Sequence, residues 1–584
     1  MKKLNRVAAS TLGLGLLSGL VFSFGCSSTP PGDGGSGGSV GVGGTGTGTG
    51  GVGNGTGGVG NGTGGVGNGT GGGGNGTGGG GNGTGGQQGT GGGVTTEGEP
   101  IPKPALVTTA DGDFWNDTVD PTPGGTSATI TVDSTAPLQN WIGWGGTFNE
   151  RGWVALMALD QTKRDEVMKK LFSKVDGAGI TWGRIPIGAS DYAMDRYTLC
   201  DAPCSVDNIE TTFSIERDLD PAQGLIPYIK AAQAVVTAEK AVYKGISDTI
   251  FWGSPWTPPP WMKSNNDYDK GVMKNEPAVL EAYAKYLVLW AQKYGEQGIP
   301  IDHIYPQNEP GWAQAYPSCA WGPYTDNGAD DSSTTAFLGN FVADQLVPAL
   351  SAAGLSTGVW FGTFSNDMWF SQYWGSLADK SKVRGVGLQW ETVNSIATPI
   401  AAGVTVMQSE HRCGNYPWVT GANNGTTSTA SSAEAADKTT FWADYAPNNY
   451  NYGIESWELL TQWIKAGANG YSAWNMVLDR DGKNLDIARP WPQNAMISFE
   501  ANGDVKYTPY YYVFRHLSQF VEAGGKRITA TGGDALAFQN PDGSIVTVLY
   551  NSGAATQVTL SVDGNMVQFQ APAKGWATVN TPAP

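Results

Sequence analysis

Two glutamates, Glu309 and Glu410, have the sequence settings most suited to chemistry. A short apolar segment starting at Ile304 leads to the first, and another starting at Val406 leads to the second, 101 residues further along. A buried strand that ends at a glutamate holds the carboxylate on a rigid rim, so the two could face each other across a closed barrel. Hydrolysis of a glycosidic bond needs such a pair, in which one carboxyl group protonates the leaving oxygen and the other attacks or activates water. A single glutamate would more simply be a surface residue or a charge at a helix N-terminus.

Strands and helices alternate from about residue 140 onward. The candidate strands are Trp141–Gly146, Gly183–Ile187, Thr249–Gly253, His303–Gln307, Val359–Thr363, Gly385–Gln389, Thr405–Gln408 and Gly470–Trp474. Helical stretches lie between them, at Asp165–Lys174, Pro227–Glu239, Pro277–Tyr294, Thr334–Ala353 and Ser456–Ala466. This α/β pattern predicts a (β/α)8 TIM barrel over residues 140–500, with Glu309 and Glu410 closing the fourth and seventh strands.

The pattern changes after about residue 500. Tyr507–Phe520 is a predicted helix rich in aromatic residues. Short alternating strands follow, at Leu536–Gln539, Ile545–Tyr550, Gln557–Ser561, Met566–Gln570 and Trp576–Asn580. They predict a β-sandwich over residues 501–584, to which strands from residues 101–139 could be added. The sandwich attached to the barrel would then be discontinuous in sequence.

The first 26 residues are typical of an export signal. Lys2, Lys3 and Arg6 form a basic start, and a mostly apolar run leads to Cys26. The end of this run resembles a bacterial lipoprotein signal, in which Cys26 would be lipidated and become the mature N-terminus. The alternative is ordinary secretion, with Cys26 in the discarded peptide. We therefore expect an exported protein that is secreted or held at the cell surface or outer membrane, with a lipid as its only membrane contact.

Residues 27–100 form a predicted spacer. They contain a seven-residue glycine-rich repeat with Asn54, Asn61, Asn68, Asn75 and Asn82 in register. The segment has almost no charge and almost no large apolar side chains, so it cannot compensate for the entropy lost on ordering. It is expected to be a disordered linker that holds a catalytic body away from a membrane.

The net charge of −17 argues against nucleic acid as a partner, because no basic stripe is present to neutralise phosphates. The 22 tryptophans are a high count. Many must belong to the core, but flat aromatic faces are also what sugar rings stack on. The composition therefore favours a neutral carbohydrate as the substrate, and no cofactor is expected.

Four cysteines remain once Cys26 is set aside. In an exported protein they favour disulfides, and we expect the pairs Cys200–Cys204 and Cys319–Cys413, the second bracing the rim near the two glutamates. A metal site is the weaker alternative, since no Cys-x-x-Cys spacing occurs.

Six short motifs together resemble glycoside hydrolase family 30, which contains glucosylceramidases, endo-β-1,6-glucanases and some xylanases. They occur in family order, at Gly143–Phe148, Arg184–Tyr192, Ser254–Lys263, Gln307–Pro310, Glu410–His411 and Trp474–Asp479. The resemblance covers roughly residues 105–584 and implies a barrel with a side β-sandwich and hydrolysis with retention of configuration. Glu309 would be the acid/base and Glu410 the nucleophile, about 5–5.5 Å apart.

The resemblance also implies roles for the surrounding residues. Asn308 would donate to the sugar 2-hydroxyl, with a turn-capping amide as the alternative. Arg184 would keep the nucleophile ionised, with a structural ion pair as the alternative. Asp191 matches the position that binds hydroxyls of the non-reducing sugar. Trp256 and Trp474 match aromatic walls of the pocket, with core packing as the alternative. Glu309 must stay protonated near the working pH, so its surroundings should be the more apolar or the more negative.

The resulting hypothesis is a retaining β-glycosidase, glucosylceramidase-like, acting on a β-linked, glucose-like glycan or glycoside. Within the enzyme class the alternative is an endo-acting xylanase, β-1,6-glucanase or galactanase. Outside it, the alternative is a non-catalytic carbohydrate-binding surface lipoprotein. The segment Phe148–Trp153 departs from the usual glucosylceramidase sequence, and Cys319 and Cys413 fall in insertions that would remodel the rim.

Overall fold

We describe the protein from a computed structural model, which describes residues 98–323, 335–390, 392–411, 450–479, 482, 484–485, 493–500 and 502–583. Outside these residues lie the predicted signal segment with Cys26, nearly all of the predicted spacer, and Cys413. What the sequence predicts for them stays a prediction. No helix in the described part of the chain is both long and apolar enough to cross a membrane.

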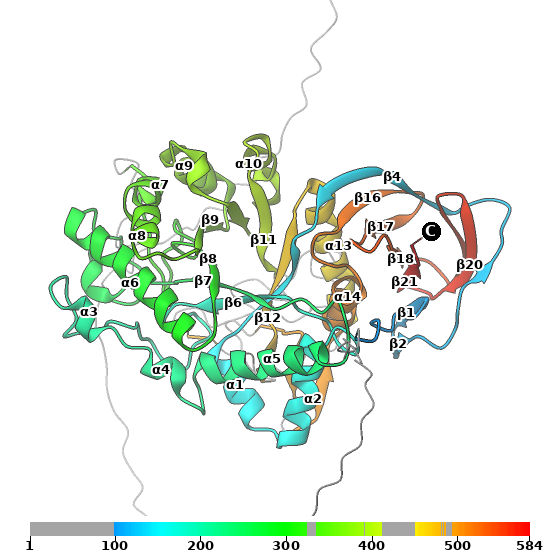
Figure 1. The fold of residues 1–584 in the computed structure, drawn as a ribbon, viewed down its shortest axis with the longest axis horizontal. Helices are drawn as coiled ribbons and strands as arrows, with labels where there is room; N and C mark the ends of the chain where they lie inside the picture. Colours follow the sequence, from blue (N-terminus) through cyan, green and yellow to red (C-terminus); the bar gives the residue numbers. More distant parts are fainter. Residues whose placement is uncertain are drawn as a thin grey trace, which may run out of the picture. The chain divides into compact units, whose positions relative to one another are not determined.

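Eight parallel strands of the described chain close into a barrel, in the spatial order β10-β11-β12-β5-β6-β7-β8-β9 (Figure 1). The strands are β5 (Gly143–Thr147), β6 (Trp182–Pro186), β7 (Ile250–Ser254), β8 (Ile301–Ile304), β9 (Gly358–Phe364), β10 (Gly385–Leu388), β11 (Thr405–His411) and β12 (Gly470–Asn475). Nearly every residue in them is buried, as expected for parallel strands covered by helices on the outside. The predicted TIM barrel is confirmed, and each observed strand overlaps its predicted counterpart.

Helices follow the strands and cover the barrel. They are α1 (Glu150–Met157), α2 (Gln161–Phe172), α3 (Ile209–Thr212), α4 (Glu216–Leu219), α5 (Leu225–Lys240), α6 (Pro277–Glu296), α7 (Leu338–Phe341), α8 (Val347–Ala352), α9 (Asp367–Ser376), α10 (Ala397–Ala401), α13 (Asn451–Ala466) and α14 (Pro509–Ser518). A π-helical turn, Val342–Leu346, joins α7 to α8. Asn149 comes shortly after β5, and Asn366 comes shortly after β9. Their side chains accept hydrogen bonds from backbone N–H groups at the starts of α1 and α9.

Large aromatic side chains form a buried cluster contributed by the barrel strands. The cluster contains Trp182, Trp252, Tyr305, Trp360 and Met407. These side chains come from β6, β7, β9 and β11 and from the residue after β8, so they occupy the volume that a hollow barrel would leave. The chemistry is therefore expected at the carboxyl ends of the strands, beyond this packed interior.

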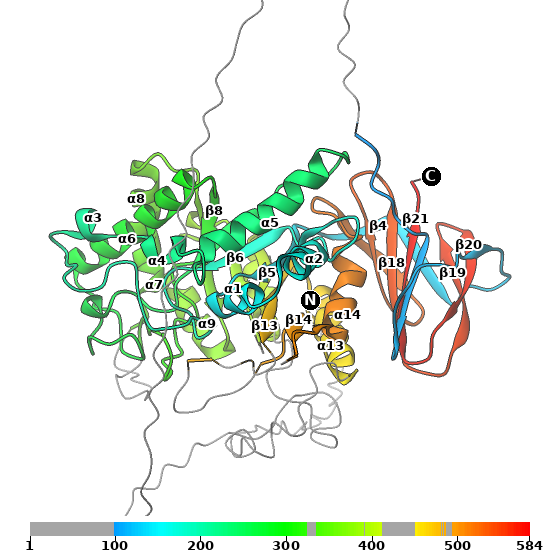
Figure 2. The ribbon, with the colours of Figure 1, turned by 90° about the horizontal axis from the view of Figure 1, so that it is seen from below.

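Ten strands of the described chain form the second sheet, in the order β2-β1-β21-β18-β17-β16-β4-β19-β20-β3. They are β1 (Leu106–Ala110), β2 (Asp113–Asn116), β3 (Thr122–Pro123), β4 (Ile130–Asn140), β16 (Lys526–Thr531), β17 (Asp534–Gln539), β18 (Ile545–Asn551), β19 (Thr556–Val562), β20 (Asn565–Ala571) and β21 (Gly575–Thr581). β1 pairs with β21, so Figure 2 shows the blue and red ends of the described chain side by side. The predicted β-sandwich is confirmed as discontinuous in sequence.

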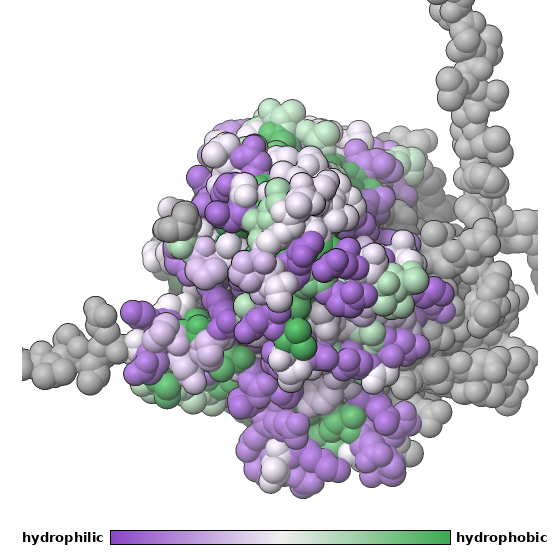
Figure 3. All heavy atoms as spheres, turned by 90° about the vertical axis from the view of Figure 1, so that its right-hand side faces the viewer, coloured by the Kyte–Doolittle hydropathy of each residue, from purple (hydrophilic) through white to green (hydrophobic). Residues whose placement is uncertain are grey.

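The long strand β4 links the layers of the sandwich, because it pairs antiparallel with β16 and, near Ile130, parallel with β19. A small sheet of β13 (Val477–Asp479), β14 (Ile497–Phe499) and β15 (Val505–Tyr507) follows the last barrel strand. On the face drawn in Figure 3, the coloured apolar residues form small separate areas among polar ones.

Candidate active site

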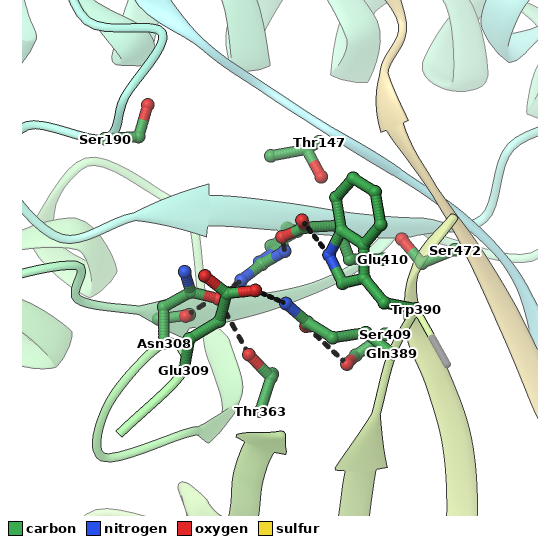
Figure 4. Close-up of polar contacts among 12 residues, drawn as sticks. Thr147, Ser190, Asn308, Glu309, Thr363, Gln389, Trp390, Ser409, Glu410 and Ser472 are labelled. Carbon is green, nitrogen blue, oxygen red and sulfur yellow. Dashed lines mark hydrogen bonds and ion pairs between the residues drawn. The ribbon is translucent and has the colours of Figure 1, made fainter. Parts of the chain in front are cut away.

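Glu309 and Glu410 are positioned by different kinds of backbone structure. Glu410 lies within β11. Glu309 lies five residues beyond the last residue of β8, and its backbone is fixed by a hydrogen bond from its N–H to the carbonyl of Thr363 at 2.8 Å. Its φ of 46° places it in the left-handed region, which non-glycine residues rarely adopt. Figure 4 shows the two glutamate side chains pointing toward one another.

Arg184 and Trp390 hold the carboxylate of Glu410. Arg184, on β6, donates from Nη1 to Glu410 Oε2, and the Trp390 indole N–H donates to Oε1 at 3.0 Å. Each oxygen of Glu410 thus accepts a bond, one of them from a cation. Because the Arg184 side chain is fully buried, its charge acts with little screening from solvent. These contacts suit a negatively charged carboxylate that keeps one orientation.

The same arginine connects Glu410 to Asn308. Arg184 Nη2 donates to Asn308 Oδ1 at 2.7 Å and to Ser254 Oγ at 3.2 Å. Thr363 Oγ1 also donates to Asn308 Oδ1, at 2.7 Å. Two donors on its oxygen fix the amide orientation of Asn308, and its Nδ2 group points away from Thr363. The amide could then donate to a substrate hydroxyl.

Glu309 has neutral hydrogen-bond partners. Gln389 Nε2 donates to its Oε1 at 3.2 Å, and the Tyr316 hydroxyl donates to its Oε2 at 3.3 Å. The carboxyl group keeps some contact with solvent but is surrounded by protein atoms. This burial, together with the negative charge of nearby Glu410, raises the pKa of Glu309 from its ordinary 4.5 to about 7. A carboxyl group in this environment can hold a proton near neutral pH.

Sequence reasoning missed the groups that orient the two glutamates. Gln389 and Trp390 follow β10 directly, and the Ser409 hydroxyl, from β11, fixes Gln389 by donating to its Oε1 at 3.1 Å. Thr363 is the partner of both Glu309 and Asn308. Their position at the carboxyl ends of predicted strands was the available signal, since barrel sites are built there.

Asp191 lies in the loop after β6 and faces the same site. It is 5% exposed, and its Oδ1 has no hydrogen-bond partner among the described residues. Burial raises its pKa well above the ordinary value, and the charges of Glu410 and Glu309 add to the rise. A buried carboxyl oxygen without a protein partner is suited to accept a hydrogen bond from a ligand hydroxyl.

Trp256 and Trp474 lie together beside Arg184. Their rings are stacked with centroids 5.2 Å apart, and the guanidinium of Arg184 lies 4.4 Å from the Trp256 ring centre. Each indole is only 2% exposed. Both indoles therefore lie next to a residue that contacts Glu410, but nearly all of their surface packs against protein, so their predicted role as a pocket wall stays a prediction.

The predicted Cys200–Cys204 disulfide is present, in the loop after β6. The indole N–H of Trp261 donates to the carbonyl of Cys200 at 3.1 Å, which ties this loop to the one after β7. Cys319 is buried. Because Cys413 lies outside the described residues, the Cys319–Cys413 pair stays a prediction. No cluster of three or more potential metal ligands occurs within the described ranges.

His411, next to Glu410, has a packing environment. Its Nδ1 contacts the Tyr471 hydroxyl, and its Nε2 lies 3.4 Å from Ser456 Oγ. The ring also stacks on Tyr510, at 4.8 Å. Both ring nitrogens thus face protein groups, as expected for a structural residue and not for a catalytic base.

A closed parallel barrel with two facing carboxyl groups at its carboxyl-terminal rim, joined to a β-sandwich, defines the class as a glycoside hydrolase. The chain belongs to glycosyl hydrolase family 30. The model of the "Glycosyl hydrolase family 30 TIM-barrel domain" matches residues 142–354, and that of the "Glycosyl hydrolase family 30 beta sandwich domain" matches residues 524–579. The resemblance read from the six motifs is confirmed, and the protein is a hydrolase of glycosidic bonds.

Relatives within the family have different substrates in their names. The chain is 25% identical to the endo-1,6-beta-D-glucanase BGN16.3 of Trichoderma harzianum, over 74% of this chain and 81% of the relative. It is 22% identical to the lysosomal acid glucosylceramidase of Mus musculus, over 73% and 78%. Among solved structures, the endo-beta1,6-glucanase BT3312 is 22% identical, with a TM-score of 0.63 over 82% of this chain and 100% of that one.

Proposed function

We propose that this protein is a retaining β-glycosidase that cleaves a β-linked, glucose-like glycan or glycoside by double displacement. The observation that carries the proposal is the difference between the two carboxyl environments. Glu410 is bonded to the cation of Arg184, whereas Glu309 has neutral partners and a pKa raised to about 7. One group is thus prepared as a nucleophile and the other as a proton donor.

In the first step, Glu410 attacks the anomeric carbon while the protonated Glu309 gives its proton to the leaving oxygen. The leaving alcohol departs and a glycosyl ester forms on Glu410. Loss of the negative charge of Glu410 in this ester lowers the proton affinity of Glu309, since that charge had helped to raise its pKa. Glu309 is then the better base for the second step, in which it takes a proton from water. The water attacks the ester and releases the sugar with its original configuration.

The sugar in the reacting position is inferred from Asp191 and Asn308. A free carboxyl oxygen on one side and an oriented amide on the other suit two hydroxyl groups of one ring. A hexose such as glucose offers more hydroxyl contacts than a pentose, which weighs modestly against xylan. The names of the glucosylceramidase and β-1,6-glucanase relatives support a β-glucoside as well.

Rescue of a Glu309→Ala variant by azide tests the role of Glu309. Aryl β-glucosides with good leaving groups need little protonation, so the variant should form the glycosyl-enzyme but hydrolyse it slowly. Azide needs no base, and it should restore turnover and give a β-glycosyl azide, while the wild-type rate should not rise. An α-glycosyl azide, or a folded variant without rescue, would contradict the assignment.

A further inference from the structure

Trp312 is held close to Glu309 by a tight turn. The N–H of Trp312 donates to the carbonyl of Glu309 at 2.8 Å, so the two residues are the first and last of a four-residue turn. The ends of such a turn lie within about 7 Å of each other. Trp312 is partly exposed, and therefore a flat apolar side chain stands at the rim beside the proton donor.

Trp369, at the start of α9, supports this turn. Its ring centre lies 5.0 Å from that of Trp312, and a Cβ placed on Gly311 would come within 2.5 Å of its indole. The turn thus packs against Trp369, whose ring plane is tilted by 55° to that of Trp312. Trp369 is only 9% exposed, while the neighbouring Met368 is 51% exposed. The result is a small apolar surface, the supported indole of Trp312, with Met368 exposed on the helix that carries Trp369.

This surface and the sugar-binding groups come from different sides of the barrel. Asp191 and Trp256 follow β6 and β7, and Trp474 lies at the end of β12, whereas Trp312 and Met368 follow β8 and β9. Glu309 also follows β8, and it must contact the leaving oxygen in order to protonate it. The group beyond that oxygen therefore has to lie on the side of Glu309, where Trp312 stands.

We propose that Trp312, supported by Trp369, binds the leaving-group sugar, so that the substrate is a β-linked oligosaccharide or polysaccharide. This inference rests on the proposed function. A sugar ring has an apolar face that fits one indole, whereas an alkyl chain needs a continuous apolar surface. Around Trp312 the described apolar surface is short, because its chain neighbour Gln314 and the residues before Met368, Asn366 and Asp367, are polar.

The test compares Trp312→Ala and Trp312→Phe with the wild type on three kinds of substrate. These are 4-nitrophenyl β-glucoside, a panel of β-1,3-, β-1,4- and β-1,6-linked glucotrioses, and dodecyl β-glucoside. For the best glucotriose, kcat/KM of Trp312→Ala should fall about tenfold, as expected for loss of one aromatic contact. Hydrolysis of the nitrophenyl glucoside should stay within about twofold, and Trp312→Phe should recover much of the loss.

Trp261→Ala is the matched control, because it removes another partly buried indole, from the loop after β7. It should change the rates on glucotriose and nitrophenyl glucoside by the same factor. Equal losses on both substrates in Trp312→Ala would overturn the proposal, and so would a loss confined to the dodecyl glucoside, which would assign the surface to an alkyl chain. A wild type without activity on any β-glucoside would instead refute the proposed function.

Discussion

At the scale of single residues, Glu309 and Glu410 have the same type of side chain, but the groups that contact the two carboxyl groups differ in charge. The buried cation of Arg184 bonds to Glu410, and the neutral amide of Gln389 bonds to Glu309. The negative charge of Glu410, added to burial, raises the pKa of Glu309. This arrangement makes the pH dependence of both rate and stability informative.

The rate should fall on the alkaline side as Glu309 loses its proton. Its pKa of about 7 predicts that kcat/KM for a glycoside with a poor leaving group declines above about pH 7. For a substrate with a very good leaving group, which needs no proton in the first step, the alkaline decline should be weaker. An alkaline limb of equal strength for both substrates would contradict the assignment of Glu309 as the acid.

The stability of the folded protein should also depend on the protonation of Glu309, and the raised pKa fixes the direction of this pH dependence. The folded-state pKa of Glu309 lies above its ordinary 4.5, so its contribution to stability is complete below about pH 4.5 and is lost as the pH rises through about 7. Glu309→Gln avoids this loss, and its melting temperature relative to the wild type should be higher at about pH 8 than at about pH 5. Glu216→Gln, on an exposed part of α4, is the control and should show the same difference at both pH values.

Sequence motifs pointed to the proposed catalytic and binding residues better than to the groups that orient them. Glu309, Glu410, Asn308 and Arg184 could be found because each lies in a short motif. The contact of Gln389 with Glu309 depends on how the loop after β10 approaches the loop after β8, a pairing 80 residues apart. The local sequence around either residue does not indicate that two loops so far apart in the chain come into contact.

At the scale of elements, the turn from Glu309 to Trp312 determines where Glu309, the proposed proton donor, lies. Gly311 occupies its third position and packs against Trp369, where any side chain would clash. Since Glu309 begins the turn, a displacement of the turn is expected to move its carboxyl group.

Gly311→Ala should therefore lower both activity and stability. The added methyl group would meet the Trp369 indole at 2.5 Å, and overpacking of this kind costs about 1–3 kcal/mol. We expect kcat to fall by tenfold or more, because a shift of about 1 Å in a catalytic group has effects of this size. Gly375→Ala, in the same helix as Trp369 and with open space around it, should be neutral or slightly stabilising, as measured by urea unfolding. Unchanged kcat in Gly311→Ala would show that the turn does not position Glu309.

Strand positions could be predicted because buried strands of a parallel barrel are short continuous apolar runs. β16 (Lys526–Thr531) escaped prediction, since it begins with two charged residues and Ile528 and Ala530 are its only apolar side chains. It pairs with β17 and β4, and this tertiary pairing decides its conformation.

At the scale of the whole molecule, His516 on α14 joins the helix that follows the barrel to the sandwich. Its Nδ1 lies 2.7 Å from Thr578 Oγ1 on β21, and its Nε2 lies 2.8 Å from Thr109 Oγ1 on β1. The two strands come from opposite ends of the described chain. Alternating patterns predicted that residues before the barrel could join the sandwich, but the register of β1 on β21 is a long-range pairing that sequence alone does not specify.

Replacement of His516 by Ala should destabilise the protein without changing the catalysis of the folded fraction. Buried groups would lose hydrogen bonds, at a cost of about 1–3 kcal/mol at neutral pH. Burial lowers the pKa of His516 from 6.5 to about 3, so the stability it contributes is present above about pH 6.5 and declines as the pH falls toward 3. The difference in melting temperature between variant and wild type should thus shrink in acid. A difference that grows in acid, or a large change in kcat, would contradict this role.

The measurement that tests the central claim most directly is identification of the covalent intermediate. A 2-deoxy-2-fluoro-β-glucosyl fluoride slows the second step more than the first, so a retaining β-glucosidase accumulates as its glycosyl ester. Mass spectrometry of the inactivated, digested protein should find a single adduct, on Glu410, and prior substitution of Glu410 by Gln should abolish it. An adduct on another residue, or hydrolysis of β-glucosides with inversion and no adduct, would contradict the account.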